Sequence, residues 1–190
     1  MKKYKGKIIV IVAPSGTGKS TLIKQLKAEF KNLSESISYT TRAMRTGEKD
    51  GVNYFFVNPE QFKKMIENNE LIEWATVHSN YYGTSRKFVE ESLEAGKILL
   101  FDLDVQGTDS MKKLFGGFAQ VVFIEPPSLQ HLEDRLVKRG TDSRAVIDER
   151  LQNAKKELTR KNDYDYLVMN ENFDTTLVKL KEIFRKIISE

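Results

Sequence analysis

Cysteine is absent from the 190 residues of this sequence. Without cysteine, the chain cannot form disulfide bonds, a zinc finger or a thiol nucleophile. Long apolar runs are lacking too, since no stretch approaches the ~20 apolar residues of a transmembrane helix. The basic start MKKYKGK precedes a short apolar run, residues 8–13, that is too short for a signal peptide and leads into a glycine-rich loop. We therefore expect a cytoplasmic protein.

A strong charge of either sign is also lacking, because 31 Lys and Arg against 27 Asp and Glu leave a net charge of +4. The basic residues are spread along the chain rather than gathered in a tail. This balance favours nucleic acid only weakly and fits small phosphorylated ligands equally well. The length and the 39% hydrophobic content suit one domain with a real core.

Apolar patterning predicts strands that alternate with helices, which is typical of an α/β fold with a mostly parallel sheet. The expected strands cover residues 8–12, 97–101, 120–124 and 164–169, and the expected helices cover 19–31, 128–138, 144–158 and 175–188, the last capped by Asp174. Residues 37–82 interrupt this alternation with short strand-like runs around one helix. Asn58 is the expected N-cap of that helix and Pro59 its first residue. We expect this segment to form an inserted lobe.

The stretch IIVIVAPSGTGKST, residues 8–21, has the strand, glycine-rich loop and helix that a P-loop requires. Its glycines let backbone N–H groups converge on phosphate oxygens at a helix N-terminus. Lys19 would reach the β- and γ-phosphates, and the Ser20 hydroxyl would bind Mg²⁺. The usual pattern begins with Gly, where this chain has Ala13. A generic glycine-rich turn is the alternative, but the flanking elements and the GTGKST core favour phosphate binding.

A carboxylate follows a second expected strand, because KILLF leads directly into Asp102. At that edge of an α/β sheet, Asp102 could hold Mg²⁺ through water, or it could cap the next helix instead. The P-loop alone does not decide between classes of nucleotide-binding protein. The chain is too short for a helicase core, and it lacks the Asn-Lys-x-Asp motif of GTPases. A small kinase remains, with an acceptor site elsewhere in the chain.

An acceptor site is suggested by SISYTTRAMRTGEKDGVNYFFV, residues 36–57, and by YYGT, residues 81–84. Arg42 and Arg45 are three residues apart, and arginine forms forked, charge-assisted hydrogen bonds with phosphate. Tyr54 and the tyrosines of YYGT add hydroxyl donors without more charge. Together these side chains can hold one phosphate monoester. The alternative is a polar hairpin with solvated charges.

These motifs resemble the guanylate kinase family, whose members phosphorylate GMP from ATP in purine nucleotide metabolism. The resemblance spans almost the whole chain, and its TTR…R…GE…G…Y…F pattern is highly specific. It rests on APSGTGKST, on the motif of residues 36–57, on IEWA (72–75), YYGT (81–84), DLDVQG (102–107) and RLVKRG (135–140), and on Val-Met-Asn (168–170). Two positions depart from the family pattern: Met44, where Pro is frequent, and Ser79, where Gly is frequent.

The resemblance implies a three-layer fold of the P-loop nucleoside monophosphate kinase type, with a mostly parallel sheet in its core. Its core would be 1–36, 85–128 and 157–190, its GMP-binding lobe 37–84 and its lid 129–156. The catalytic residues implied are Lys19, Arg42, Arg135, Arg139 and Arg150. The implied ATP-binding residues are Ala13, Pro14, Ser15, Gly16, Thr17, Gly18, Lys19, Ser20, Thr21 and Asn170; the GMP-binding residues are Ser38, Arg42, Arg45, Tyr54, Glu73, Tyr82, Thr84 and Asp104; the Mg²⁺ ligands are Ser20 and Asp102.

Guanine recognition is consistent with the chemistry of Glu73. Its carboxylate offers two acceptors to the adjacent N1–H and N2 amine of guanine, whereas adenine presents an acceptor at N1. Ser38 could donate to O6. We expect ATP and GMP or dGMP as substrates, with no nucleic-acid or membrane partner. The sequence leaves the oligomeric state open, a homo-oligomer included.

Three other functions are compatible with parts of this sequence. Some domains of this kind are scaffolds that bind phosphorylated peptides, but Gly16, Gly18, Lys19 and Ser20 favour a working phosphate loop. A kinase of the same fold could use another acceptor, against which Glu73 argues. A nucleic-acid binder would need a more extended basic stripe. The two histidines, His78 and His131, need no catalytic role, because the acceptor phosphate oxygen is already anionic.

Overall fold

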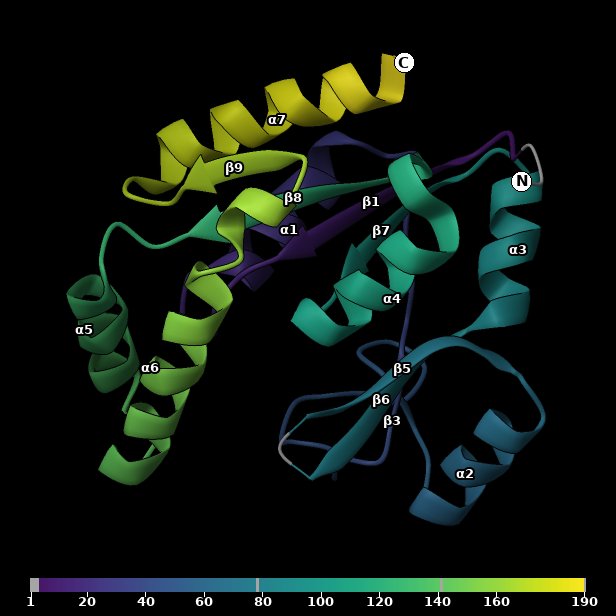
Figure 1. The fold of residues 1–190 in the computed structure, drawn as a ribbon, viewed down its shortest axis with the longest axis horizontal. Helices are drawn as coiled ribbons and strands as arrows, with labels where there is room; N and C mark the ends of the chain where they lie inside the picture. The colour runs from purple at the N-terminus through teal and green to yellow at the C-terminus, as the bar shows by residue number, and fades with distance from the viewer. Residues whose placement is uncertain (1–3, 78, 141, 190) are drawn as a thin grey trace. The chain divides into compact units, whose positions relative to one another are not determined.

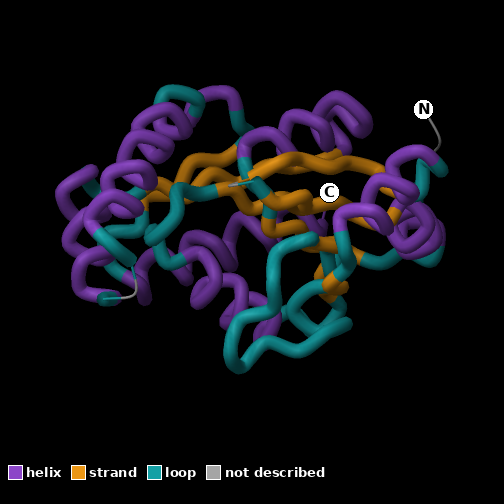
Figure 2. The backbone as a smooth tube through the Cα atoms, turned by 90° about the horizontal axis from the view of Figure 1, so that it is seen from below, coloured by secondary structure: helices purple, strands orange, loops and turns teal. Residues whose placement is uncertain are grey.

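The computed structural model describes residues 4–77, 79–140 and 142–189. The strands are β1 (Lys7–Val12), β2 (Leu33–Glu35), β3 (Tyr39–Thr40), β4 (Phe55–Phe56), β5 (Leu71–Val77), β6 (Asn80–Ser85), β7 (Ile98–Asp102), β8 (Ala119–Glu125) and β9 (Tyr166–Met169). The helices are α1 (Lys19–Glu29), α2 (Pro59–Glu67), α3 (Arg86–Glu94), α4 (Val105–Phe115), α5 (Leu129–Arg139), α6 (Arg144–Leu158) and α7 (Phe173–Ser189), with short 3₁₀ turns at Gly116–Phe118 and Lys161–Asp163. Figures 1 and 2 show the alternation of helices and strands, which confirms the predicted α/β class.

A five-stranded parallel sheet has the order β2-β7-β1-β8-β9. β2 pairs with β7 in the register Leu33↔Ile98, and β8 pairs with β9 in the register Val122↔Tyr166, both parallel. Almost every residue of β1, β7 and β8 is buried. Strands covered on both faces read as unbroken apolar runs, which is why these three were recognisable in the sequence.

The chain divides into two compact units, and one of the divisions falls within β1, between Ile8 and Ile9. The first unit joins the residues up to Ile8 to Asn32–Ala119, and the second joins Ile9–Lys31 to the residues from Gln120 onward. Helix α2 of the first unit begins as predicted: Asn58 caps it, and Gln61 completes a capping box with Asn58. Phe62 of α2 is fully buried and stacks on Tyr81 of the small sheet β4-β3-β6-β5.

In the second unit, α5 and α6 pack together around the buried cluster Leu132, Leu136, Ile147 and Ala154. Helix α7 packs on α1 and β9. Within residues 4–77, 79–140 and 142–189, no helix is both long and apolar enough to cross a membrane.

The start of the last helix differs from the prediction that Asp174 caps it. Asp174 lies inside α7, which begins at Phe173. The carboxamide oxygen of Asn172 accepts hydrogen bonds from the backbone N–H groups of Asp174 (2.9 Å) and Thr175 (3.2 Å). Asn172 therefore performs the capping role, because it stands immediately before the first helical residue, where a side-chain oxygen can accept from the free N–H groups of the first turn.

Other boundaries moved by one or two residues. Helix α1 ends at Glu29 rather than residue 31, and β9 begins at Tyr166 rather than residue 164. The three-residue strand β2 was not predicted, because so short a segment carries no periodic signal. One of the strand-like runs expected within residues 37–82, LIEWATVH (71–78), forms β5, which ends at Val77, and His78 lies outside the described residues. Ser79 has a φ of 64°, a left-handed conformation that explains why Gly suits this position.

Candidate active site

The glycine-rich loop of the second unit connects β1 to α1. Gly16 and Gly18 have φ values of 92° and 97°, which side chains disfavour, so the loop needs glycine at both positions. Thr17 between them is fully buried, and its Oγ1 donates to the carbonyl of Pro14 over 2.7 Å. The loop is thereby closed by its own hydrogen bonds, next to the N-terminus of α1, where Lys19, Ser20 and Thr21 form the first turn.

The carbonyl of Thr17 is held from two sides. The Asn170 carboxamide donates to it over 2.6 Å, and the Arg135 guanidinium donates over 2.9 Å. Arg135 also donates to the carbonyl of Asn170 over 3.3 Å. Asn170 is 3% exposed, and its side-chain oxygen has no hydrogen-bond partner among the residues that the structure describes. Three residues predicted to bind or act on ATP thus lie together.

The other arginines expected on the donor side come from α5 and α6. Arg150 donates to the hydroxyl of Ser15 over 2.9 Å and pairs with Asp142 at 3.4 Å. Arg139 is exposed at the last position of α5. A Cβ on Gly16 would lie 3.0 Å from Leu136 of α5, so α5 is packed directly against the loop.

The first unit gathers the residues predicted to hold the acceptor phosphate. The Arg42 guanidinium lies 5.5 Å from the ring centre of Tyr54, and Tyr54 meets Tyr82 edge to face at 5.9 Å. Arg42 bonds to both carboxylate oxygens of Glu48, and this partner raises the pKa of Arg42 above its usual value. The exposed Arg45 joins the same group through its backbone N–H, which donates to Glu48 over 2.8 Å.

Glu48 was not among the predicted site residues. It lies in the quoted GE pair of residues 47–48, but no rule of spacing distinguishes it from a solvated glutamate. Only the fold brings its carboxylate against Arg42.

The structure also shows why Tyr54 suits the role of a hydrogen-bond donor. Burial, assisted by the charge of Asp102, raises the pKa of Tyr54 to about 12, so its hydroxyl keeps its proton.

A second cluster in the first unit contains the residues predicted to face guanine. Glu73 of β5 is 6% exposed, and Thr84 of β6 donates to it over 2.6 Å. Burial raises the pKa of Glu73 to about 7; the Thr84 hydrogen bond opposes this rise, and the charge of Asp104 adds to it. Asp104 caps α4 by accepting from the N–H of Gly107 over 2.8 Å. Ser38 stands immediately before β3, and its carbonyl accepts from Phe55.

The two residues predicted to hold Mg²⁺ lie in different units. Ser20 is in the first turn of α1, and Asp102 is the exposed last residue of β7. Both offer the hard oxygen ligands that Mg²⁺ prefers. Within the described ranges, no three His, Cys, Asp or Glu side chains form a metal cluster.

Comparison with known proteins decides the family. The family model described as guanylate kinase matches residues 5–187. The chain belongs to the guanylate kinase family. The guanylate kinase of Sulfurimonas denitrificans is 45% identical over 183 residues, which cover 96% of this chain and 89% of that protein. The guanylate kinase of Helicobacter hepaticus is 46% identical, with 96% and 92% covered.

A solved structure agrees with these relatives. The crystal structure of guanylate kinase from Anaplasma phagocytophilum superposes with a TM-score of 0.78 and 32% identity, covering 99% of this chain and 89% of the other. The resemblance inferred from motifs is confirmed, and so is the α/β fold with its separate small sheet. This guanylate kinase is an enzyme that phosphorylates GMP with ATP, in a family that uses Mg-ATP.

Proposed function

We propose that this guanylate kinase transfers the γ-phosphoryl group of ATP directly to a phosphate oxygen of GMP or dGMP, in the cytoplasm, as a step of purine nucleotide metabolism. The observation that carries the site assignment is the buried carboxylate of Glu73 with the Thr84 hydroxyl 2.6 Å away. A carboxylate that has lost its water needs a ligand with matching donors. Guanine supplies two, its N1–H and its N2 amine.

Selectivity follows from the same carboxylate. Adenine would direct the lone pair of its N1 at Glu73 and leave both buried groups unsatisfied, which costs binding free energy. Asp104, whose charge acts on Glu73, lies at the N-terminus of α4 and would complete the face that meets the base. Ser38 would donate to the guanine O6.

The phosphate of GMP would be held by Arg42, Arg45, Tyr54 and Tyr82. Support comes from the close group that Arg42 forms with Tyr54 and from the edge-to-face contact of Tyr54 with Tyr82. Two guanidinium groups and two phenol hydroxyls would offer a dianion several donors, and their charges would balance its own. These residues would orient the acceptor oxygen of GMP toward the γ-phosphorus of ATP. No general base would be needed, because that oxygen is already anionic.

The donor nucleotide would lie on the loop Ala13–Gly18 and the first turn of α1. Lys19 would approach the β- and γ-phosphates, Arg135, Arg139 and Arg150 would balance charge on the transferring group, and Asn170 would lie near the adenine. Ser20 and Asp102 would hold Mg²⁺, which neutralises charge on the ATP phosphates when bound. In the transfer, a bond forms between the GMP oxygen and Pγ, the bond from Pγ to the β–γ bridging oxygen breaks, and ADP leaves with that electron pair.

Three functional parts are proposed within the single domain: a core of residues 1–36, 85–128 and 157–190, a GMP-binding lobe of 37–84 and a lid of 129–156. Lobe and lid would close over the core when both substrates bind, since water near the γ-phosphate would hydrolyse ATP unproductively. Small-angle scattering with and without a bisubstrate analogue tests this. Identical curves would overturn closure.

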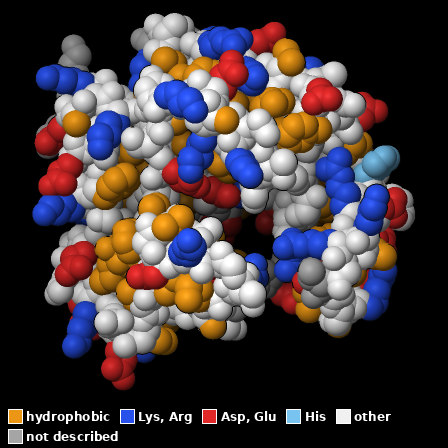
Figure 3. Space-filling view, turned by 180° about the vertical axis from the view of Figure 1, so that it is seen from behind, with side chains coloured by type: hydrophobic (Ala, Val, Ile, Leu, Met, Phe, Trp, Pro, Cys, Tyr) orange, Lys and Arg blue, Asp and Glu red, His pale blue; other side chains and the backbone are white. Residues whose placement is uncertain are grey.

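Nucleotides rather than nucleic acid are the proposed partners. On the face drawn in Figure 3, the Lys and Arg side chains are scattered among acidic and apolar ones. An extended basic stripe is the usual electrostatic signature of a nucleic-acid surface, and this distribution does not favour it.

The decisive experiment compares acceptors. ADP release from Mg-ATP is followed with GMP, dGMP, AMP, CMP and UMP, using the wild type, Glu73→Gln and the control Glu60→Gln, which removes an exposed carboxylate from α2. The wild type and the control should turn over GMP and dGMP alone. Glu73→Gln should lose much of the preference for GMP over AMP, because an amide presents only one acceptor. An unchanged preference would remove Glu73 from base recognition.

A further inference from the structure

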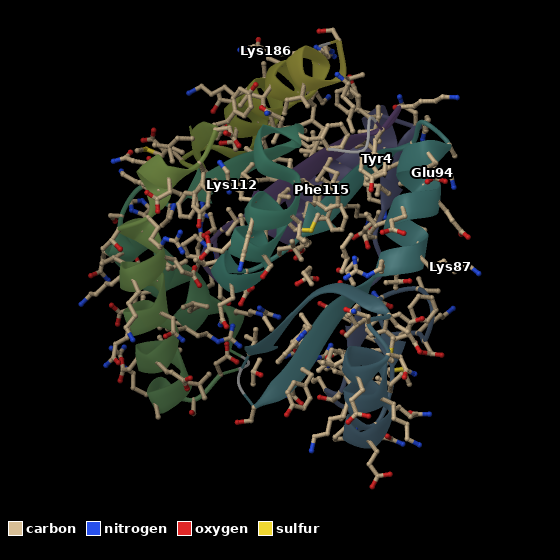
Figure 4. The ribbon with its side chains drawn as sticks, turned by 45° about the vertical axis from the view of Figure 1, so that its right-hand side comes forward. Tyr4, Lys87, Glu94, Lys112, Phe115 and Lys186 are labelled. Atoms are coloured by element: carbon tan, nitrogen blue, oxygen red, sulfur yellow. The ribbon has the colours of Figure 1, made fainter. Side chains whose placement is uncertain are left out.

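Gly107 occupies an unusual place in the first unit, at the third position of helix α4. This helix packs against β5, and it also carries Lys112 and Phe115, which are labelled in Figure 4. Glycine inside a helix costs up to about 1 kcal/mol relative to alanine. Its backbone does not require glycine, because Gly107 has no positive φ. The reason for a glycine here therefore lies in its surroundings.

The space beside Gly107 is taken by two carboxylates. A Cβ built on it would lie 3.1 Å from Oε2 of Glu73 and 3.3 Å from Oδ1 of Asp104. Both separations are tighter than nearly all real Cβ contacts, so a methyl group would displace one carboxylate or the helix itself. The buried Glu73 has little room to withdraw, since it is 6% exposed and already bonded to Thr84.

The backbone of the same residue acts on the second carboxylate. The N–H of Gly107 donates to Oδ1 of Asp104 over 2.8 Å. Gly107 thus fixes Asp104 with its amide, while its bare Cα leaves space for Glu73. One residue sets the separation of two like charges, and the charge of Asp104 is a cause of the raised pKa of Glu73.

We propose that Gly107 is a specificity-determining positioning residue, whose missing side chain lets the Glu73 carboxylate reach the depth at which it reads both donors of guanine. The proposal rests on the assignment of Glu73 and Asp104 to the guanine face. Gly107 itself touches no substrate in this scheme and acts through the two carboxylates. An added methyl group would shift the Glu73 carboxylate, so that it could no longer accept from both guanine donors at once.

The test compares GMP with IMP, whose base keeps N1–H and O6 but lacks the N2 amine. In Gly107→Ala, kcat/KM for GMP should fall about tenfold or more, and the GMP/IMP ratio should fall by a similar factor, because the bidentate contact becomes a single one. The change should appear mainly in KM for GMP. The pH midpoint of guanosine binding should also rise, since the methyl group further desolvates Glu73.

A matched control is available in the same unit. A Cβ on Gly117 meets no heavy atom within 4 Å in the described part of the chain, and its φ is not positive, so Gly117→Ala should keep the wild-type ratio. The higher helix propensity of alanine offsets part of the strain from the close contact with the two carboxylates, so Gly107→Ala should change the melting temperature little. Lost selectivity without lost stability would separate positioning from unfolding.

A rescue variant covers the case in which Gly107→Ala folds poorly. Glu73→Asp shortens the carboxylate side chain by one methylene and frees the space that the new methyl group needs. The double variant Glu73→Asp/Gly107→Ala should fold, and its GMP/IMP ratio should lie no lower than that of Glu73→Asp alone. A further additive loss in the double variant would mean that the two residues act separately, and would overturn the proposal.

The outcomes distinguish this inference from the site assignment beneath it. If Glu73→Gln abolishes the GMP/IMP preference while Gly107→Ala keeps the wild-type ratio and pH midpoint, the role of Gly107 is wrong and the guanine site stands. If Glu73→Gln itself keeps the preference, the guanine site is wrong and the inference falls with it. If both Glu73→Gln and Gly107→Ala lose the GMP/IMP preference while Gly117→Ala keeps it, the result supports both the guanine site and the role of Gly107.

Discussion

A single nitrogen of the Arg42 guanidinium, Nη2, donates to both carboxylate oxygens of Glu48, over 2.8 and 3.0 Å. Nη1 of the same group donates to the carbonyl of Ala43 over 2.6 Å. The side chains of the pair are 14% and 18% exposed. Arg42 is thereby oriented beside Tyr54, and the Glu48 side chain contributes to that orientation together with the Ala43 carbonyl.

Glu48→Ala should raise KM for GMP roughly tenfold and change kcat little, because Arg42 loses a charge-assisted pair that holds it in place. Steady-state kinetics at fixed ionic strength measure this. Glu48→Gln, which keeps one acceptor, should fall between the wild type and Glu48→Ala. A lower KM in Glu48→Ala would show instead that Glu48 competes with the phosphate for Arg42.

Guanosine binding should strengthen as pH rises from 6 to 8, because Glu73, with a pKa of about 7, must be deprotonated to accept two hydrogen bonds. The gain should approach tenfold over that interval. Guanosine is the right probe, since it lacks a phosphate that titrates in this range. Calorimetry on Glu73→Gln should show a flat profile; a sloping one would assign the titration to another group.

The same pKa predicts the sign of a stability effect. The folded-state pKa of Glu73 lies above its ordinary value of 4.5, so the folded protein holds this proton more tightly than the unfolded chain. The resulting stabilisation is complete below about pH 4.5 and is lost as pH rises through 7. Urea titrations give the free energy of unfolding of the wild type and of Glu73→Gln at each pH. The difference between the two should isolate the contribution of Glu73.

Lys19→Ala should lower kcat about a hundredfold or more with little change in GMP affinity, because the charge beside the transferring group is lost while the acceptor residues are untouched. Lys24→Ala on the exposed face of α1 is the control and should behave as the wild type. Near-normal turnover in Lys19→Ala would exclude the proposed donor site.

Asn172→Ala should destabilise the fold by about 1 kcal/mol, because the first turn of α7 loses its capping acceptor. Asp174→Ala should cost less, since an acidic residue inside the first turn acts on that turn through the helix dipole. Denaturant unfolding of both variants decides the matter. A larger loss in Asp174→Ala would restore Asp174 as the cap.

Local patterns explain most of what the sequence revealed. The P-loop was recognisable because its chemistry is contiguous, and Asn58 because a capping residue and its proline are neighbours. Asn172 and Asp174 show the limit: both residue types cap well, and only the position of the first helical turn decides between them. Glu48 and Gly107 escaped notice because their importance comes from the side chains that the fold places opposite them.

The two hydrogen bonds that Asn170 and Arg135 donate to the Thr17 carbonyl also affect the amide hydrogen of Gly18. A peptide unit is planar and trans, so its N–H points opposite to its C=O. Asn170 and Arg135 pull the Thr17 oxygen to one side of the loop, and the amide hydrogen of Gly18 is thereby turned to the other. Two side chains that never contact that hydrogen determine the direction in which it is offered to an anion.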